Sequence, residues 1–249
     1  MNRPDETLDD LTMGGLKILQ AKSGYRFSID PVLLCAFVPS VKNARIADLG
    51  TGNGIIPLLL SCRQEACQIT GVEFQTAMVE RARRSVQLNG RQESIQIMQG
   101  DLRELPEELA AESFDIVTAN PPYRNQGTGR LAPGDERAVA RHELAGGLDV
   151  FLRAAAFLLH SGGRFYVVYL AERLAELLSE MRCFRLEPKR LRMVHSRKGE
   201  AARMVLVEGR KNGKPGLSIE PPLIIYIGTG RDYSQETLAM YETDVEREE

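Results

Sequence analysis

Short apolar runs alternate with longer amphipathic stretches in the first half of the chain. The runs at residues 45–49, 68–72, 95–98 and 114–119 have the length and composition of buried strands. Between them, residues 55–62 and 75–88 are predicted to form helices, the second with an arginine-rich outer face that we expect to be solvated. Strands that alternate with helices in this way indicate an α/β fold built on a parallel sheet.

The second half of the chain continues the alternation. Helices are predicted at 148–160 and 171–181, and strands at 164–169, 184–194 and 202–208. Together with the first four, these strands give a seven-stranded, mostly parallel sheet with helices on both faces. Residues 217–219 and 221–226 are expected to add short edge strands.

The N-terminal residues differ in character from this core. Residues 1–12 are polar and expected to be mobile, whereas 16–20 alternate as a short strand that a Ser-Gly turn connects to residues 25–29. Asp30 followed by Pro31 is a strong helix start, with the aspartate as N-cap and the helix over 32–38. At the other end, the acidic residues 236–249 are expected to be a disordered tail.

Composition narrows the class of protein only a little. A hydrophobic share of 43% in 249 residues is ample for a folded core, and a net charge of −2 points to no particular partner. No Cys-x-x-Cys pair is present, so the cysteines are expected to be reduced thiols in or near the core of a cytoplasmic protein. They are Cys35, Cys62, Cys67 and Cys183. The N-terminus does not have the pattern of a signal peptide, and no apolar run is long enough to span a membrane.

Polar residues stand where the first four strands end. Asp48 leads into the loop Gly50-Thr51-Gly52-Asn53-Gly54, which permits a tight turn and a close approach of backbone to ligand. The dinucleotide-binding pattern would need glycine at Ile55, so a nicotinamide cofactor is disfavoured. Glu73 ends the second strand and could accept both ribose hydroxyls of an adenosine, and Asp101, after the third, suits an adenine amino group.

The fourth strand runs into Asn120-Pro121-Pro122-Tyr123. Proline lacks the N–H that a sheet needs and fixes its φ angle, so the chain leaves the sheet in a stiff shape. That shape presents an amide side chain, carbonyl oxygens and an aromatic ring. These groups suit a flat substrate that carries an amino group, with acceptors for its N–H bonds and a face for stacking. We therefore predict that these four residues form the catalytic site.

Two further stretches point to a large substrate. Residues 124–146 form a long loop without periodicity directly after this motif, and we interpret it as a lid that faces the substrate and contains His142, which could contact it. From Arg182 to Lys214 there are eleven Lys or Arg residues against three Asp or Glu, a local net charge of +8, which favours a nucleic-acid backbone over a solvated face. The predicted RNA-binding residues are Arg190, Arg192, Arg197, Lys198, Arg210 and Lys211.

These motifs carry a family resemblance. The loop at residues 48–54, the two acids and Asn-Pro-Pro-Tyr look like the motifs of Rossmann-like amino-methyltransferases that use S-adenosylmethionine. More narrowly, residues 14–235 resemble the bacterial valine-tRNA adenine N6-methyltransferases, which modify the adenine beside the anticodon. The resemblance implies a tRNA partner, no metal, and a cofactor site that includes the segment 25–30. It assigns to that site Tyr25, Arg26, Phe27, Asp30, Asp48, Gly50, Thr51, Gly52, Gly54, Glu73, Phe74, Asp101, Leu102 and Asn120.

The chain is accordingly expected to consist of an extension over the cofactor site (1–40), a methyltransferase domain (41–235) and the acidic tail. The Asn-Pro-Pro-Tyr motif does not determine the substrate, because enzymes that methylate protein glutamine at N5 or ribosomal guanine at N2 share it. A catalytically idle RNA-binding protein of the same fold is the alternative from another class. The basic stretch, and the lack of a helical domain ahead of the first strand, favour tRNA.

Overall fold

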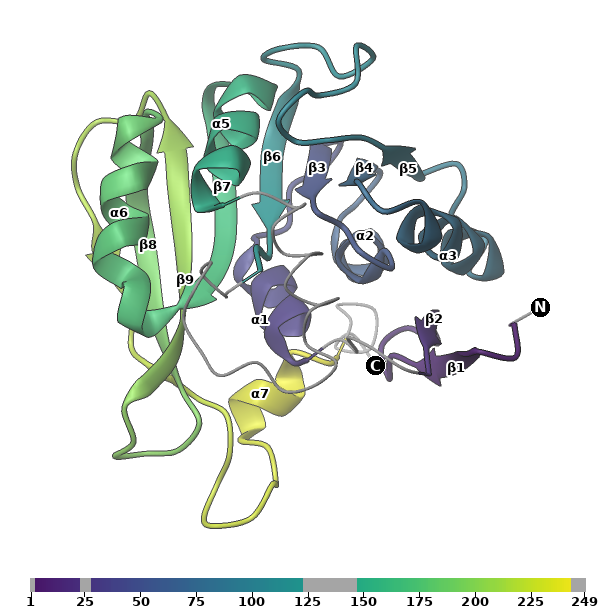
Figure 1. The fold of residues 1–249 in the computed structure, drawn as a ribbon. Coiled ribbons are helices and arrows are strands. Elements are labelled where there is room, and N and C mark those ends of the chain that lie inside the picture. Colours follow the sequence, from purple (N-terminus) through teal and green to yellow (C-terminus); the bar gives the residue numbers. More distant parts are fainter. Residues whose placement is uncertain (1–2, 23–27, 123–146, 243–249) are drawn as a thin grey trace, which may run out of the picture.

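The computed structural model describes residues 3–22, 28–122 and 147–242. They form one large sheet and one separate hairpin (Figure 1). The central strands of the sheet are β3 (Arg45–Leu49), β4 (Gln68–Glu73), β5 (Ile95–Gln99), β6 (Phe114–Ala119), β7 (Leu159–Leu170), β8 (Leu186–His195) and β9 (Ala202–Lys211). The two-residue strands β10 (Ser218–Ile219) and β11 (Leu223–Ile224) both pair with β8.

The strand order is β10-β8-β9-β7-β6-β3-β4-β5, with β11 beside β8. All neighbouring strands are parallel except β9, which runs antiparallel to both β7 and β8. The predicted seven-stranded, mostly parallel sheet is therefore confirmed, with β10 and β11 as the expected short additions. Because β3, β4, β5 and β6 are parallel, the polar residues that follow them come to one edge of the sheet.

Helices cover both faces, as predicted, and divide the core into two. One apolar cluster joins the sheet to α1 (Asp30–Phe37), α2 (Ile55–Arg63) and α3 (Thr76–Leu88). The other joins it to α5 (Leu148–Leu158) and α6 (Leu174–Cys183). Successive strand residues alternate between the clusters: Ile116 lies in the first and Val117 in the second, as the two-residue period of a strand requires. A sheet buried on both faces explains why its strands are apolar throughout.

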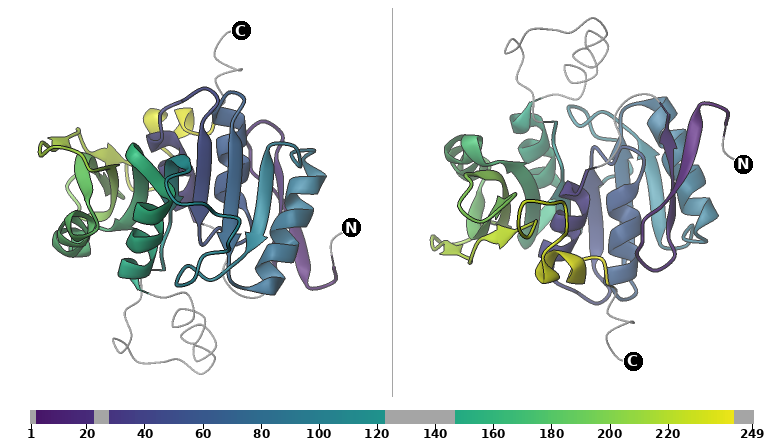
Figure 2. Two further views of the ribbon diagram at one scale, coloured as in Figure 1. Left: turned by 90° about the horizontal axis from the view of Figure 1, so that it is seen from above. Right: turned by 90° about the horizontal axis from the view of Figure 1, so that it is seen from below.

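The N-terminal residues are more ordered than predicted. Residues 6–10, expected to be mobile, form β1 (Glu6–Asp10), which pairs antiparallel with β2 (Lys17–Ala21). The hairpin lies beside α3 (Figure 2). Glu6 is buried there and forms ion pairs with Arg81 at 3.2 Å and Arg84 at 2.5 Å, so the arginine face of α3 is not simply solvated. The segment 25–29 that follows the Ser-Gly turn falls largely outside the described residues.

Smaller corrections follow from local structure. Ile29, not Asp30, is the N-cap of α1, so the aspartate is the first helical residue. The helix expected to reach residue 160 stops at Leu158, because β7 begins at the next residue. A 3₁₀ turn over Ala171–Arg173 precedes α6, and α7 (Gln235–Ala239) occupies part of the tail that we expected to be disordered. Cys183 is exposed, unlike the other three cysteines.

The described residues lack two features. None of their helices has the length and apolar character that a bilayer span requires. They also contain no group of three or more His, Cys, Asp or Glu side chains placed to hold a metal ion.

Candidate active site

The loop after β3 turns on three glycines in the left-handed region. Gly50, Gly52 and Gly54 have φ angles of +65°, +59° and +84°, a conformation that other residues adopt at a cost. Gly54 is also the N-cap of α2. The amide of Thr51 donates to the carbonyl of Val72 at 3.0 Å, which ties the loop to the end of β4. The loop is therefore a fixed backbone turn at the carboxyl edge of the sheet.

Glu73 fastens the same loop from the neighbouring strand. Its carboxylate accepts one hydrogen bond from the amide of Gly52 and one from the amide of Gln75, both at 2.9 Å. The side chain is buried, yet each oxygen keeps further acceptor capacity, since a carboxylate offers about four lone-pair positions. The predicted ribose acceptor thus lies against the glycine loop, as a shared ligand would require.

Asp48 is fully buried beneath the loop. The hydroxyl of Thr118 donates to its Oδ1 at 2.8 Å, while Oδ2 has no hydrogen-bond partner among the described atoms. Burial is the main cause that raises the pKa of Asp48 to about 7, and the nearby charge of Glu73 contributes in the same direction. Sequence reasoning did not identify Thr118, although a threonine within a buried apolar run was a usable signal; the sheet register places it directly opposite Asp48.

A hollow of about 340 Å³ opens beside Glu73, where an adenine ring was expected. It is lined by Phe74, Gln75, Thr76, Gln99, Gly100 and Asp101. The ring of Phe74 is 38% exposed, so it offers an apolar face to this space. Asp101 is held by Arg103, whose Nε lies 2.9 and 3.0 Å from the two carboxylate oxygens and whose amide also donates to it. That contact lowers the pKa of Asp101 and keeps it an acceptor.

Asn120 follows β6 at the same edge. The register pairs Ala119 with Leu49, so Asn120 stands level with Gly50, the first residue of the loop on the adjacent strand. Pro121 is buried and Pro122 is partly buried, which fixes the exit of the chain from the sheet. Tyr123 lies outside the described residues, as do His142 and the cofactor candidates at positions 25, 26 and 27.

The described residues fit the S-adenosylmethionine expected from the motifs. Gly52 has open space where a side chain would stand, and the unpartnered Oδ2 of Asp48 lies below the same loop. Glu73 and Asp101 supply acceptors on two successive strands, and Leu102 follows directly in the chain. Asp30 starts α1, whose apolar residues pack in the same core as α2.

Comparison with known proteins places this arrangement in a family. Residues 29–182 match the family model described as methyltransferase small domain. The chain belongs to the methyltransferase small domain family. One curated relative, from Phocaeicola vulgatus, is named tRNA1(Val) (adenine(37)-N6)-methyltransferase; it is 31% identical over 72% of this chain and 74% of its own. A relative of the same name from Tolumonas auensis is 29% identical over 89% of this chain and 90% of its own.

Solved structures agree on the fold. The crystal structure of a predicted O-methyltransferase from Agrobacterium tumefaciens, protein Atu636, aligns with a TM-score of 0.68 and 24% identity over 85% of this chain and 95% of that one. At that identity the likeness bears on architecture alone. It confirms the methyltransferase fold expected from the sequence.

Several of the predicted RNA-binding residues of this methyltransferase are engaged within the protein. Arg190 forms ion pairs with Glu208 at 3.1 Å and Glu220 at 3.3 Å, and its guanidinium lies 4.0 Å from the centre of the Phe37 ring. Arg192 pairs with Glu236 at 2.5 Å. These two arginines therefore hold β8 to α1 and α7. Their partners come from distant parts of the chain, so the charge pattern of the sequence could not show that they are engaged.

The other four predicted residues divide between two edges of the sheet. Arg197 and Lys198 follow the end of β8, at the edge that holds Asn120, whereas Arg210 and Lys211 end β9 at the opposite edge. Nine residues of strand separate the two edges along β8, roughly 30 Å at ~3.3 Å per residue. Lys211 also pairs with Glu112 at 2.9 Å. The six residues therefore do not form one continuous cluster.

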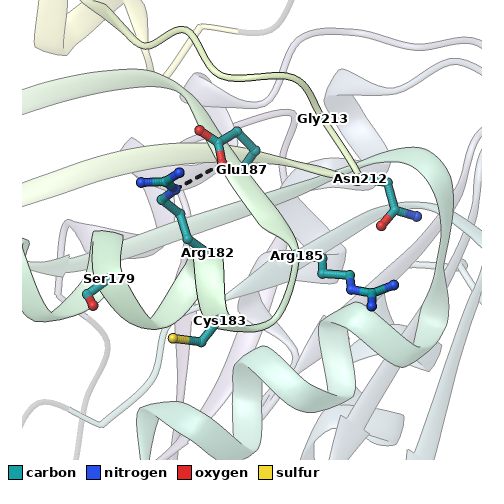
Figure 3. Close-up of a pocket in the computed structure, with 7 residues that line it drawn as sticks. All are labelled: Ser179, Arg182, Cys183, Arg185, Glu187, Asn212 and Gly213. Atoms are coloured by element: carbon teal, nitrogen blue, oxygen red, sulfur yellow. Dashed lines mark hydrogen bonds and ion pairs between the residues drawn. The ribbon is translucent and has the colours of Figure 1, made fainter.

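A hollow of about 720 Å³ lies at that opposite edge. Figure 3 shows its lining residues, Ser179, Arg182, Cys183, Arg185, Glu187, Asn212 and Gly213. Arg182 faces Glu187 across it at 3.2 Å. It is remote from Asn120 and from the glycine loop, so its size does not make it the active site.

Proposed function

We propose that this protein transfers a methyl group from S-adenosylmethionine to the exocyclic N6 of an adenine in tRNA, adenine 37 of valine tRNA. The observation that carries the proposal is the position of Asn120-Pro121-Pro122 level with the glycine loop on adjacent parallel strands. The names of the curated relatives supply the base and the tRNA. We place the reaction in the cytoplasm, residues 41–235 in the catalytic domain, and residues 1–40 in an extension over the cofactor.

The cofactor supplies an electrophilic methyl group. The glycine loop would hold its amino-acid and ribose parts, because its backbone is fixed in place by Val72 and Glu73. Glu73 would accept from the ribose hydroxyls, and Asp101 from the adenine amino group beside the ring of Phe74. In this arrangement each acceptor is already oriented by a protein donor, so little reorganisation is needed on binding.

The target adenine must leave any stack to reach this edge of the sheet, and a base in a single-stranded loop does so at lower cost than one in a duplex. Its amino nitrogen is a poor nucleophile, since the lone pair is delocalised into the ring. The side-chain oxygen of Asn120 and the carbonyl of Pro121 would accept its two N–H bonds. They would stabilise the positive charge that develops on nitrogen as the N–C bond forms, while the bond from the methyl carbon to the cofactor sulfur breaks and a neutral thioether is left; the nitrogen would then lose one proton to water.

Tyr123 would stack on the base, an interaction worth ~1–3 kcal/mol in proteins that bind single strands.

The mechanism is tested by Asn120→Ala. The variant is expected to lower kcat by a factor of roughly 10²–10³, the cost of removing one such polar group from a transition state. Binding of S-adenosylmethionine, measured by calorimetry, is expected to stay within a few-fold of wild type. Thr118→Val is a useful comparison, because it removes a hydroxyl two residues away on the same strand that contacts Asp48 rather than the base. Near-wild-type turnover in Asn120→Ala would sink the proposal.

A further inference from the structure

Three exposed cations remain without a partner at the edge of the sheet that holds Asn120. They are Lys198, Arg203 and Arg231. None has a hydrogen bond, ion pair or ring contact with any described side chain or backbone group, in contrast to Arg190 and Arg192. A cation without an internal partner gives up less on meeting an external anion, because no existing ion pair has to be broken first.

The three residues lie on segments that are close together in space, although Arg231 is distant from the other two in the sequence. Lys198 lies in the turn between β8 and β9, and Arg203 is the second residue of β9. Arg231 lies in the segment after β11, and β11 pairs with the edge of β8 that faces away from β9. In Figure 1 both connections, light green and yellow, extend past the lower ends of β8 and β9, on the side to which β6 points.

Arg197 holds the two connections together. Its Nη2 donates to the carbonyl of Gly230 at 2.7 Å, its Nη1 lies 3.6 Å from Glu200, and its guanidinium lies 5.4 Å from the centre of the Tyr226 ring. Tyr226 in turn stacks on Tyr233, with ring centres 5.4 Å apart. The segment that carries Arg231 is therefore fixed relative to the turn that carries Lys198, and the surface is formed before any ligand arrives.

Acidic side chains around this surface are partly engaged. Glu200 is paired with Arg197, and Glu236 with Arg192. Two other carboxylates form no ion pair within the described residues: Glu172, in the turn after β7 that packs beside β9, and Asp232, beside Arg231. The three unpaired cations outnumber these two carboxylates, so the net charge of the surface is positive.

We infer that Lys198, Arg203 and Arg231 form the surface that binds the phosphate backbone of the tRNA flanking the target adenine, with Arg197 as its positioning residue. The inference rests on the proposed function. It replaces the continuous stripe along β8 and β9 that the sequence predicted. Phosphate contacts position a nucleic acid without reading its sequence, so this surface would orient the loop while the Asn120 edge selects the base.

The test is the triple variant Lys198→Gln, Arg203→Gln and Arg231→Gln, with an unmodified valine-tRNA transcript as the probe. Each lost contact to a single strand should reduce the slope of log K against log salt by ~0.7, about 2 for the three, and weaken binding roughly a hundredfold at 0.1 M salt. The KM for tRNA should rise correspondingly, whereas kcat and the affinity for S-adenosylmethionine should not change.

Two controls separate charge from structure and position. Lys198→Arg, Arg203→Lys and Arg231→Lys should restore the salt slope. Arg185→Gln, Arg210→Gln and Lys214→Gln, three exposed cations at the opposite edge, should leave it unchanged. If the first triple binds and methylates tRNA like wild type, the surface is wrong although the function stands. If the opposite-edge triple is the one that weakens binding, the RNA lies across the other edge. If wild type itself neither binds nor methylates tRNA, the proposed function fails with it.

Discussion

Replacing Arg190 with glutamine is expected to destabilise the fold and to leave the salt dependence of RNA binding unchanged. Its guanidinium contacts Glu208 and Glu220 and lies over the ring of Phe37, and its Nη2 donates to the carbonyl of Phe37 at 2.5 Å. That carbonyl belongs to the last residue of α1. One side chain thus links the C-terminal end of α1 to two strands and to the segment before β11.

The expected loss in the free energy of unfolding depends on the charged groups that Arg190→Gln leaves without a partner. Removing one partner of a buried ion pair costs ~3–5 kcal/mol, because the remaining charge loses its compensation. The side chain of Glu208 is 15% exposed and that of Arg190 is 30% exposed, so solvent compensates for part of this. The lost ring contact adds ~0.5–2 kcal/mol. We expect a loss of about 3 kcal/mol in the free energy of unfolding, since these contributions are not additive.

Urea denaturation followed by circular dichroism measures this loss. With an m-value of roughly 3 kcal/mol/M, the midpoint should fall by about 1 M urea. Lys198→Gln is the matched comparison, because that lysine is exposed and its replacement should change stability by no more than ~0.5 kcal/mol. An unchanged midpoint together with a flatter salt dependence of tRNA binding would refute the reasoning and return Arg190 to the RNA interface.

Three further predictions concern buried positions. Contact with Arg84 lowers the pKa of Glu6 to about 2, so the ionised carboxylate stabilises the fold fully above pH 4.5, its pKa in the unfolded chain, and this stabilisation is lost as the pH falls through 2. Glu6→Gln should therefore lower the free energy of unfolding by about 3 kcal/mol at pH 7 and by progressively less below pH 4.5. A difference in urea midpoints that does not depend on pH would exclude the ion pair as the cause. Burial raises the pKa of Asp48 to about 7, so the protein loses stability as the pH rises from about 4 to 7. The free energy of unfolding of Asp48→Asn should exceed that of wild type by up to about 4 kcal/mol at pH 8 and by almost nothing at pH 4. Equal differences in melting temperature at the two pH values would contradict this. Gly71→Ala would bring a methyl group within 2.9 Å of the side chain of Thr51, so it should displace the glycine loop and weaken the binding of S-adenosylmethionine. An unchanged affinity for S-adenosylmethionine in calorimetry would count against a fixed loop.

The parts of the fold that the sequence reveals are those determined locally. Strands β3, β4 and β6 are short apolar runs that end in glycine, an acid or Asn-Pro, so their position and their shared edge could be predicted. Partners that are distant in the chain could not. Glu6 orders β1 through Arg84, 78 residues away, and Arg190 reaches Phe37, 153 residues away. A count of charges shows how many cations a stretch holds, but only the tertiary structure shows which of them remain available.

The same distinction between local pattern and distant partners applies to the residues of the candidate active site. The placement of Asp48, Glu73 and Asp101 at one edge of the sheet could be predicted, because each lies within two residues of the end of a strand. Thr118 and Arg103 were missed because their roles depend on the side chains that they orient rather than on a motif of their own.

The central claim is tested most directly by incubating the protein with tRNA from cells that lack the modification and S-adenosylmethionine labelled in its methyl group, followed by digestion to nucleosides. We expect label in N6-methyladenosine, from valine tRNA alone, and none with Asn120→Ala. Label in another nucleoside, or no label in tRNA with cofactor binding intact and transfer to a peptide glutamine instead, would contradict it.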